Sequence, residues 1–280
     1  MIRKIVSGMI YTLCALLGLL AFIYPFLSAS GTQAAAAAQP AVAEGQNAPL
    51  LTATLVGLSL MALLIEVQGE AISAKTVAML GVLVAGTSLL RFLEVAIPLP
   101  GGFSPIFAPI MLAGFVFGGR FGFLMGSFTV LISALITGGV GPWLPYQMFT
   151  AGWVGMTAGW LGLVPLRHKR QGGPHVAFGY RELIVLCLAG FGWGLLYGAI
   201  INVYFWPFAA GPAGQSYQAG LGLGEILARY GAFYLATSLG WDMARAIGNV
   251  ALILFLGAPM VRALARFRRR FYFEVQPNDR

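Results

Sequence analysis

Long apolar segments that carry almost no charge dominate this chain of 280 residues. A helix needs about 20 predominantly apolar residues to cross the hydrocarbon core of a membrane. Eight segments approach or exceed that length: 5–27, 50–67, 76–93, 106–118, 121–135, 147–164, 183–205 and 239–260. They are continuous rather than alternating, which argues against a transmembrane β-barrel. Only 9% of the residues are charged, against roughly 25% in soluble domains, so the sequence predicts an all-α integral membrane protein.

The segments suggest three parts along the chain. Residues 1–70 form an expected N-terminal transmembrane extension, whose two spans are joined by an alanine-rich outer linker over 28–48. Residues 71–270 form the expected membrane core, and residues 271–280 a cytoplasmic tail. The first span could also be a signal peptide, but its apolar run exceeds the usual 7–15 residues, so we expect a retained anchor. The short segments 106–118 and 121–135 are expected to extend into their flanking loops.

The basic residues predict the orientation in the membrane. Lysine and arginine accumulate in cytoplasmic loops, and threading eight spans from a cytoplasmic N-terminus places 14 of the 17 basic residues inside. Both termini are then cytoplasmic. Because these residues flank apolar spans, the net charge of +8 reflects this bias and not a nucleic-acid surface. A helix running from 222 to 262 would be about 60 Å long, so we expect a break near 237–240 and an interfacial helix before it.

Two pairs of ionisable residues lie near the outer ends of predicted spans. Arg91 and Glu94 end the third span, and Asp242 and Arg245 lie in the first turn of the last, three residues apart on one helix face. Ionisable groups at membrane depth are expensive and usually functional. The alternative is a pair of interfacial ion pairs, or arginines that snorkel to lipid headgroups.

Uncharged polar and aromatic residues gather on the same side. An amide near a helix end gains nothing from lipid, so Gln147 and Asn202 favour a binding pocket for a bulky organic solute. The aromatic belt of a membrane interface is the alternative for the rings. With the two ionisable pairs, the candidate substrate-binding residues are Phe103, Trp143, Tyr146, Gln147, Asn202, Trp206, Tyr234, Trp241 and Asn249.

Motifs for enzymatic chemistry are missing from the sequence. There is no GxxxxGK[ST] phosphate loop and no HExxH motif, and both histidines, His168 and His175, fall in a basic cytoplasmic loop. We therefore expect no catalytic residues, no metal site and no bound cofactor. Small-xxx-small pairs such as Gly81/Ala85, Gly114/Gly118, Gly122/Gly126 and Gly155/Gly159 predict close helix packing, and one on an outer face is able to dock a membrane partner.

Two blocks of sequence resemble a known family. GGFSPIFAPIMLAGFVFGGRFGFLMGSFTVLISALITGGVGPWLPYQMFTAGWVGMTAGWLG (101–162) and FYLATSLGWDMARAIGN (233–249) are similar to the substrate-binding (S) component of energy-coupling factor (ECF) transporters. The resemblance implies a six-helix core that binds a vitamin from outside, while a transmembrane coupling (T) component and two ATP-binding cassette ATPases use ATP. Residues 101–105, 143–147, 202–206 and 241–249 correspond to its pocket.

The resemblance also implies how the core meets its partners. S components of the family are thought to topple in the membrane and to dock through an Ala-xxx-Ala motif on the first core helix, for which Gly81 and Ala85 are an approximate match. The pattern is closest to members linked to cobalamin or a related corrinoid; thiamine precursors, riboflavin and queuosine precursors stay open. The expected location is the cytoplasmic membrane of a bacterium or archaeon. A self-sufficient secondary transporter and a ligand-free membrane scaffold are the rival hypotheses.

Overall fold

The computed structural model describes residues 74–97, 103–163, 178–209 and 211–271, together with isolated positions between 5 and 61. Within these ranges the chain is helical and contains no strand. The elements are α4 (Ala74–Ala96), α5 (Phe107–Phe117), α6 (Gly119–Thr137), α7 (Leu144–Leu161), α8 (Tyr180–Phe205), the 3-10 turn η2 (Trp206–Phe208), α9 (Leu223–Thr237) and α10 (Leu239–Phe271). The expected alanine-rich linker, the basic loop with both histidines and residues 272–280 lie outside the described residues.

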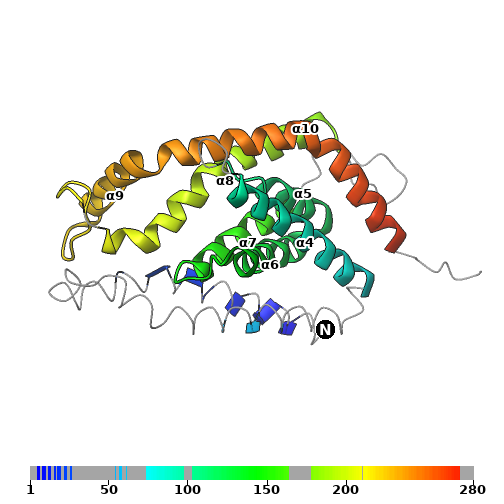
Figure 1. The fold of residues 1–280 in the computed structure, drawn as a ribbon, viewed down its shortest axis with the longest axis horizontal. Helices are drawn as coiled ribbons and strands as arrows, with labels where there is room; N and C mark the ends of the chain where they lie inside the picture. The colour runs from blue at the N-terminus through cyan, green and yellow to red at the C-terminus, as the bar shows by residue number, and fades with distance from the viewer. Residues whose placement is uncertain are drawn as a thin grey trace, which may run out of the picture.

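Within the described ranges, four helices are long and apolar enough to cross a membrane: Ala74–Ala96, Gly119–Thr137, Tyr180–Phe208 and Leu239–Arg268. The prediction of an all-α membrane protein is confirmed. The expected break before the last span is also found, because α9 ends at Thr237 and α10 begins at Leu239. Figure 1 shows α8 and α10 as long neighbours along one side of the bundle, with α9 at one end.

The short helix α5 differs from the prediction. Segment 121–135 extends at both ends as expected, to Gly119 and Thr137, but segment 106–118 does not. Gly118 ends α5 with φ 100°, a conformation that favours glycine. Eleven residues at 1.5 Å per residue reach only about 16 Å, and all of them but Phe117 are buried. Helix α5 is therefore enclosed by its neighbours as a core element.

Glycines set the spacing of α6 and α7. A Cβ added at Gly155 would lie 2.1 Å from the carbonyl oxygen of Gly122, and one added at Gly126 would lie 2.1 Å from that of Ala151. A Cβ added at Gly114 of α5 would lie 2.2 Å from the carbonyl oxygen of Gly155. Backbones this close exclude any side chain, which is the packing that the small-xxx-small pairs predict.

Helices α8 and α10 also approach closely through glycines, over a longer stretch of helix. Gly190, Gly194 and Gly198 recur every fourth residue and face α10; a Cβ at Gly194 would lie 2.3 Å from the Cα of Ala246. Pro259 lies inside α10, and the helix bends in that region (Figure 1), as expected where proline removes an intrahelical hydrogen bond. The close approach of α8 to the first turns of α10 builds one wall of the site described next.

Candidate functional site

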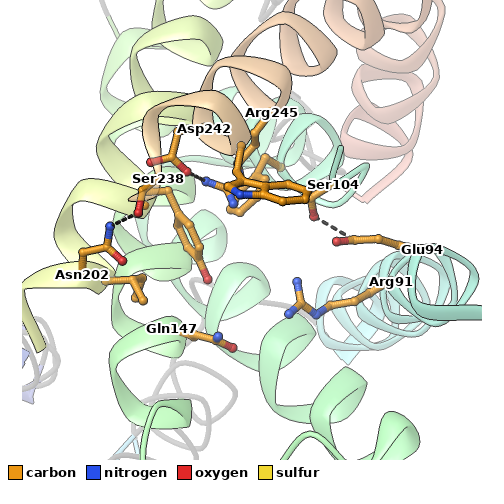
Figure 2. A pocket seen from close by; sticks show the side chains of 13 residues that line it. Arg91, Glu94, Ser104, Gln147, Asn202, Ser238, Asp242 and Arg245 are labelled. Atoms are coloured by element: carbon orange, nitrogen blue, oxygen red, sulfur yellow. Dashed lines mark hydrogen bonds and ion pairs between the residues drawn. The ribbon is translucent and has the colours of Figure 1, made fainter. Parts of the chain in front are cut away.

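A pocket of about 270 Å³ opens at one end of the helix bundle. Its walls come from the last turn of α4, the start of α5, the first turn of α7, the last turns of α8 and the start of α10. Figure 2 shows the polar side chains of these elements facing a common space. The lining residues are Arg91, Glu94, Ser104, Phe107, Gln147, Tyr197, Gly198, Ile201, Asn202, Ser238, Trp241, Asp242 and Arg245.

The ends of the helices at this side of the bundle place the polar residues at the pocket. Helix α6 stops at Gly138, whose φ of 69° lies in the left-handed region and gives a C-cap that glycine accepts without strain. Pro145 then occupies the first turn of α7, where its missing N–H costs no hydrogen bond. This geometry turns Gln147 into the pocket (Figure 2). The glycines and prolines of 137–147 therefore position one wall.

Asp242 and Arg245 form an ion pair along one face of α10. Asp242 is 2% exposed, and the guanidinium of Arg245 lies 5.3 Å from the ring centre of Tyr197 and 5.9 Å from that of Phe107. Those two rings contact each other edge to face at 4.6 Å. Arg245 is thus held by a carboxylate and by two aromatic faces, an arrangement that suits a partly desolvated guanidinium.

On the opposite wall, Arg91 and Glu94 project from the last two turns of α4. The Ser104 hydroxyl donates a hydrogen bond to Glu94 Oε2 at 2.8 Å. Arg91 makes no hydrogen bond or ion pair with any residue that the structure describes. Figure 2 shows its guanidinium pointing into the space above Gln147. Glu94 is therefore anchored, whereas Arg91 is available.

Several buried polar atoms of the pocket lack a partner. Among the described residues, five buried side-chain atoms make no hydrogen bond, and three of them belong to the lining: Tyr197 OH, Asp242 Oδ2 and Arg245 Nε. Buried polar groups in native proteins are nearly always satisfied by protein, water or ligand. Three of the five unpartnered atoms therefore belong to residues that line one cavity.

The side-chain amide of Asn202 also lines this wall, and only its N–H₂ group is bonded within the described part of the protein. Its Nδ2 donates to the Ser238 hydroxyl at 2.6 Å, at the junction between α9 and α10. Ser238 and Asn202 both line the pocket, so the amide is oriented by the helix break and presents its carbonyl oxygen as a further acceptor.

Of the thirteen predicted substrate-binding residues, seven line this pocket: Arg91, Glu94, Gln147, Asn202, Trp241, Asp242 and Arg245. The other six lie elsewhere. Phe103 packs on Gly248 of α10, Tyr234 donates to the carbonyl of Leu195 at 3.3 Å, and Asn249 is buried and donates to the carbonyl of Gly190 at 3.0 Å.

The remaining three are aromatic residues with structural contacts. Trp143 is 43% exposed and donates to the carbonyl of Gly139. Tyr146 is buried and stacks on Tyr204 with ring centres 4.2 Å apart. Trp206 is 2% exposed and donates to the carbonyl of Gln215 at 2.7 Å. These contacts build the wall behind the pocket and tie down the loop before α9.

Isolated positions of the N-terminal segment reach this aromatic wall. Phe22 contacts Tyr146 edge to face at 5.0 Å, and Phe26 contacts Tyr217 at 5.2 Å and Trp206 at 6.4 Å. Phe22 and Phe26 therefore lie against aromatic residues at the same end of the bundle as the pocket.

Six lining residues were not among the predicted ones: Ser104, Phe107, Tyr197, Gly198, Ile201 and Ser238. Gly198 lies one turn before Asn202 on the same face of α8, so helical spacing from Asn202 would have found it. Ser104 and Phe107 carry no such signal, since their positions depend on how α5 packs.

Outside the membrane-spanning helices, burial and the nearby carboxylate of Asp242 raise the pKa of Tyr234 to about 12. Its phenol therefore stays neutral at physiological pH and remains a hydrogen-bond donor on the α9 side of the site. In the part of the chain that the structure describes, no group of three or more His, Cys, Asp or Glu side chains could hold a metal ion.

The pair expected to dock a partner lies away from the pocket. Gly81 and Ala85 are exposed on α4, and a Cβ at Gly81 would meet no atom within 4 Å. The face is therefore unoccupied by the described part of the chain, and its docking role stays a prediction.

Comparison with known proteins identifies a family with this sequence pattern. The model of the ECF transporter substrate-specific component family matches residues 75–257, which includes every lining residue of the pocket. Searches of curated proteins and of solved structures find no match. Members of the family are transporter subunits that bind a substrate and work with a T component and ATPases. Because the match covers well over half of the 280 residues, the chain belongs to the substrate-specific component family of ECF transporters.

Proposed function

We propose that this chain captures a vitamin-class solute in the pocket between α4, α5, α7, α8 and α10, and delivers it to a separate module of one T component and two ABC ATPases. The observation that carries this proposal is the set of buried, unpartnered polar atoms around one cavity: Tyr197 OH, Asp242 Oδ2 and Arg245 Nε. Each such atom costs about 1–3 kcal/mol when left unsatisfied. A polar solute that pairs with them recovers that free energy on binding.

The pocket combines flat rings with polar groups. Phe107, Tyr197 and Trp241 offer aromatic surface, while Gln147 and Asn202 offer amides. This mixture is typical of sites for heterocyclic organic solutes, in which rings provide contact area and a few polar groups fix orientation.

Two classes of vitamin are candidates. The resemblance to cobalamin-linked members makes cobalamin or a related corrinoid the first. The volume of about 270 Å³ lies just below the usual range for drug-sized ligands, which favours a compact vitamin such as a thiamine precursor or riboflavin. A corrinoid would need the mouth beside Trp241, which is 58% exposed, to open further.

The proposed topology places the pocket at the outer face of a bacterial or archaeal cytoplasmic membrane, with both termini inside. Its support is the distribution of charge. The pocket is formed where α4 and α8 end and α10 begins, while Lys75, Arg181, Arg262 and Arg266 lie toward the other ends of these helices. Basic residues mark the cytoplasmic side.

Two rival functions make different predictions. A self-sufficient secondary transporter would move substrate across the membrane without the ATPase module. A ligand-free scaffold would not depend on the pocket at all. The family's use of separate ATPases and the polar character of the pocket both favour the capture subunit.

The test is an uptake assay in proteoliposomes with radiolabelled cobalamin, thiamine, riboflavin, nicotinate, pantothenate and biotin. We expect uptake of one of them only when the T component, both ATPases and ATP are present. Uptake by this chain alone under an ion gradient would support the secondary transporter. Absence of binding and uptake for every vitamin would support the scaffold and contradict the proposal.

A further inference from the structure

The four charged side chains of the pocket differ in how many protein groups they already bind. Arg245 is bound to Asp242 and is flanked by the rings of Phe107 and Tyr197. Glu94 accepts the Ser104 hydroxyl. Arg91 alone among the four has no hydrogen bond or ion pair within the described ranges. It is half-buried and lines the cavity, so N–H donors of its guanidinium are available to an occupant.

Gln147 lies across the same space and is also available. Its side-chain amide has no hydrogen-bond partner among the described residues, although it is only partly exposed. Figure 2 shows Arg91 and Gln147 on neighbouring walls with open space between them. A guanidinium fork and an amide N–H₂ that converge on one space form a site for a planar oxyanion.

The charges in the lining limit the net charge of the occupant. Two arginines and two carboxylates sum to zero, so the lining itself balances no net charge of an occupant. A phosphate would leave up to two negative charges to be compensated by the solute's own groups, and a carboxylate leaves one. A compensating donor fits at the far wall, where Asp242 Oδ2 makes no hydrogen bond to any residue that the structure describes.

Building on the proposed function, we propose that the transported solute carries a carboxylate that binds between Arg91 and Gln147, and that its N–H or O–H donors face Asp242. The solute is thus an acid that also carries hydrogen-bond donors, rather than a neutral or purely cationic molecule. Arg91 and Gln147 set its orientation by fixing the acid end on the α4–α7 side of the pocket.

The test compares matched acids and neutral analogues on the full chain purified in neutral detergent. The probes are nicotinate with nicotinamide, pantothenate with pantothenol, and biotin with biotinamide, measured by thermal shift and calorimetry. We expect at least one acid to bind about tenfold or more tightly than its neutral partner. Arg91→Gln should abolish that ratio, and Arg91→Lys should keep part of it. Arg262→Gln, an exposed change on α10 far from the pocket, should leave it unchanged.

Three results with the acid and neutral probes would overturn the proposal. The neutral analogue could bind as tightly as its acid, the ratio could survive in Arg91→Gln, or none of the acids could bind. Binding of cobalamin or riboflavin in the same assay would then leave the proposed function standing without this inference. Loss of the acid preference on adding phosphatidylglycerol would assign Arg91 to a lipid headgroup and would also overturn it.

Discussion

The carboxylate of Asp242 lies directly against the backbone of Gly198: a Cβ added there would stand 2.0 Å from Oδ2 and 2.1 Å from Oδ1. The contact joins α8 to the first turn of α10 and holds Asp242 where it can pair with Arg245. Because Gly198 has no side chain, it determines where Asp242, the only buried carboxylate of the pocket, lies.

Gly198→Ala should therefore displace Asp242 without unfolding the protein. We expect affinity for the transported vitamin to fall at least tenfold, because the carboxylate must leave its pairing position. Calorimetry with the vitamin identified in the uptake assay measures this. Gly192→Ala on the same helix is the matched control, since a Cβ there meets no atom within 4 Å. Equal affinity in the two variants would show that the position of Asp242 does not matter for ligand binding.

Asp242→Ala and Gln147→Ala should each weaken binding by about 1 kcal/mol or more, since each removes a polar partner of the buried ligand. The Asp242 variant should also lower thermal stability, because it leaves the Arg245 guanidinium without its counter-ion in a mostly buried place. Gln147→Ala should bind more weakly without that loss of stability. Unchanged affinity in both variants would move the site elsewhere.

Gly155→Ala should destabilise the bundle. Its new methyl group would lie 2.1 Å from the carbonyl oxygen of Gly122, and forced separation of packed backbones costs typically about 1–3 kcal/mol. Thermal unfolding in detergent, followed by the loss of helical circular dichroism, measures the change. Gly86→Ala on α4 meets no atom within 4 Å and should unfold at the wild-type temperature. Matching temperatures for both variants would refute the close-packing explanation.

Gly81→Leu tests the predicted docking face. The side chain at this position enters open space on α4, so fold and vitamin affinity should stay at wild-type values. If the face docks the T component, ATP-driven uptake should fall several-fold, and less of the module should co-purify with the chain. Full uptake and full co-purification would place the docking surface on another helix.

Much of this architecture could be predicted from particular residues. The charge of Arg91, Glu94, Asp242 and Arg245 at the ends of apolar runs was enough to place them together, because charge inside a membrane needs partners or solvent. The break at Thr237 followed from helix length alone. Both signals are one-dimensional and do not depend on packing.

Other features depend on three-dimensional packing that no local pattern contains. Trp143 and Gln147 are four residues apart, yet one is exposed and bonds to Gly139 whereas the other faces the pocket, because α7 begins between them. Helix α5 stayed short because Gly118 ends it and its neighbours enclose it. The contribution of Ser104 appears only once Glu94 is placed beside it.

The most direct test of the pocket is mass spectrometry of the small molecule that co-purifies with the full chain in a mild detergent. We expect one vitamin-class species in near-stoichiometric amount with the wild type, strongly reduced in Asp242→Ala and Gln147→Ala, and unchanged in Gly192→Ala. A wild-type protein that retains no solute, even after incubation with the candidate vitamins, would contradict the assignment of this pocket, as would equal retention by all four proteins.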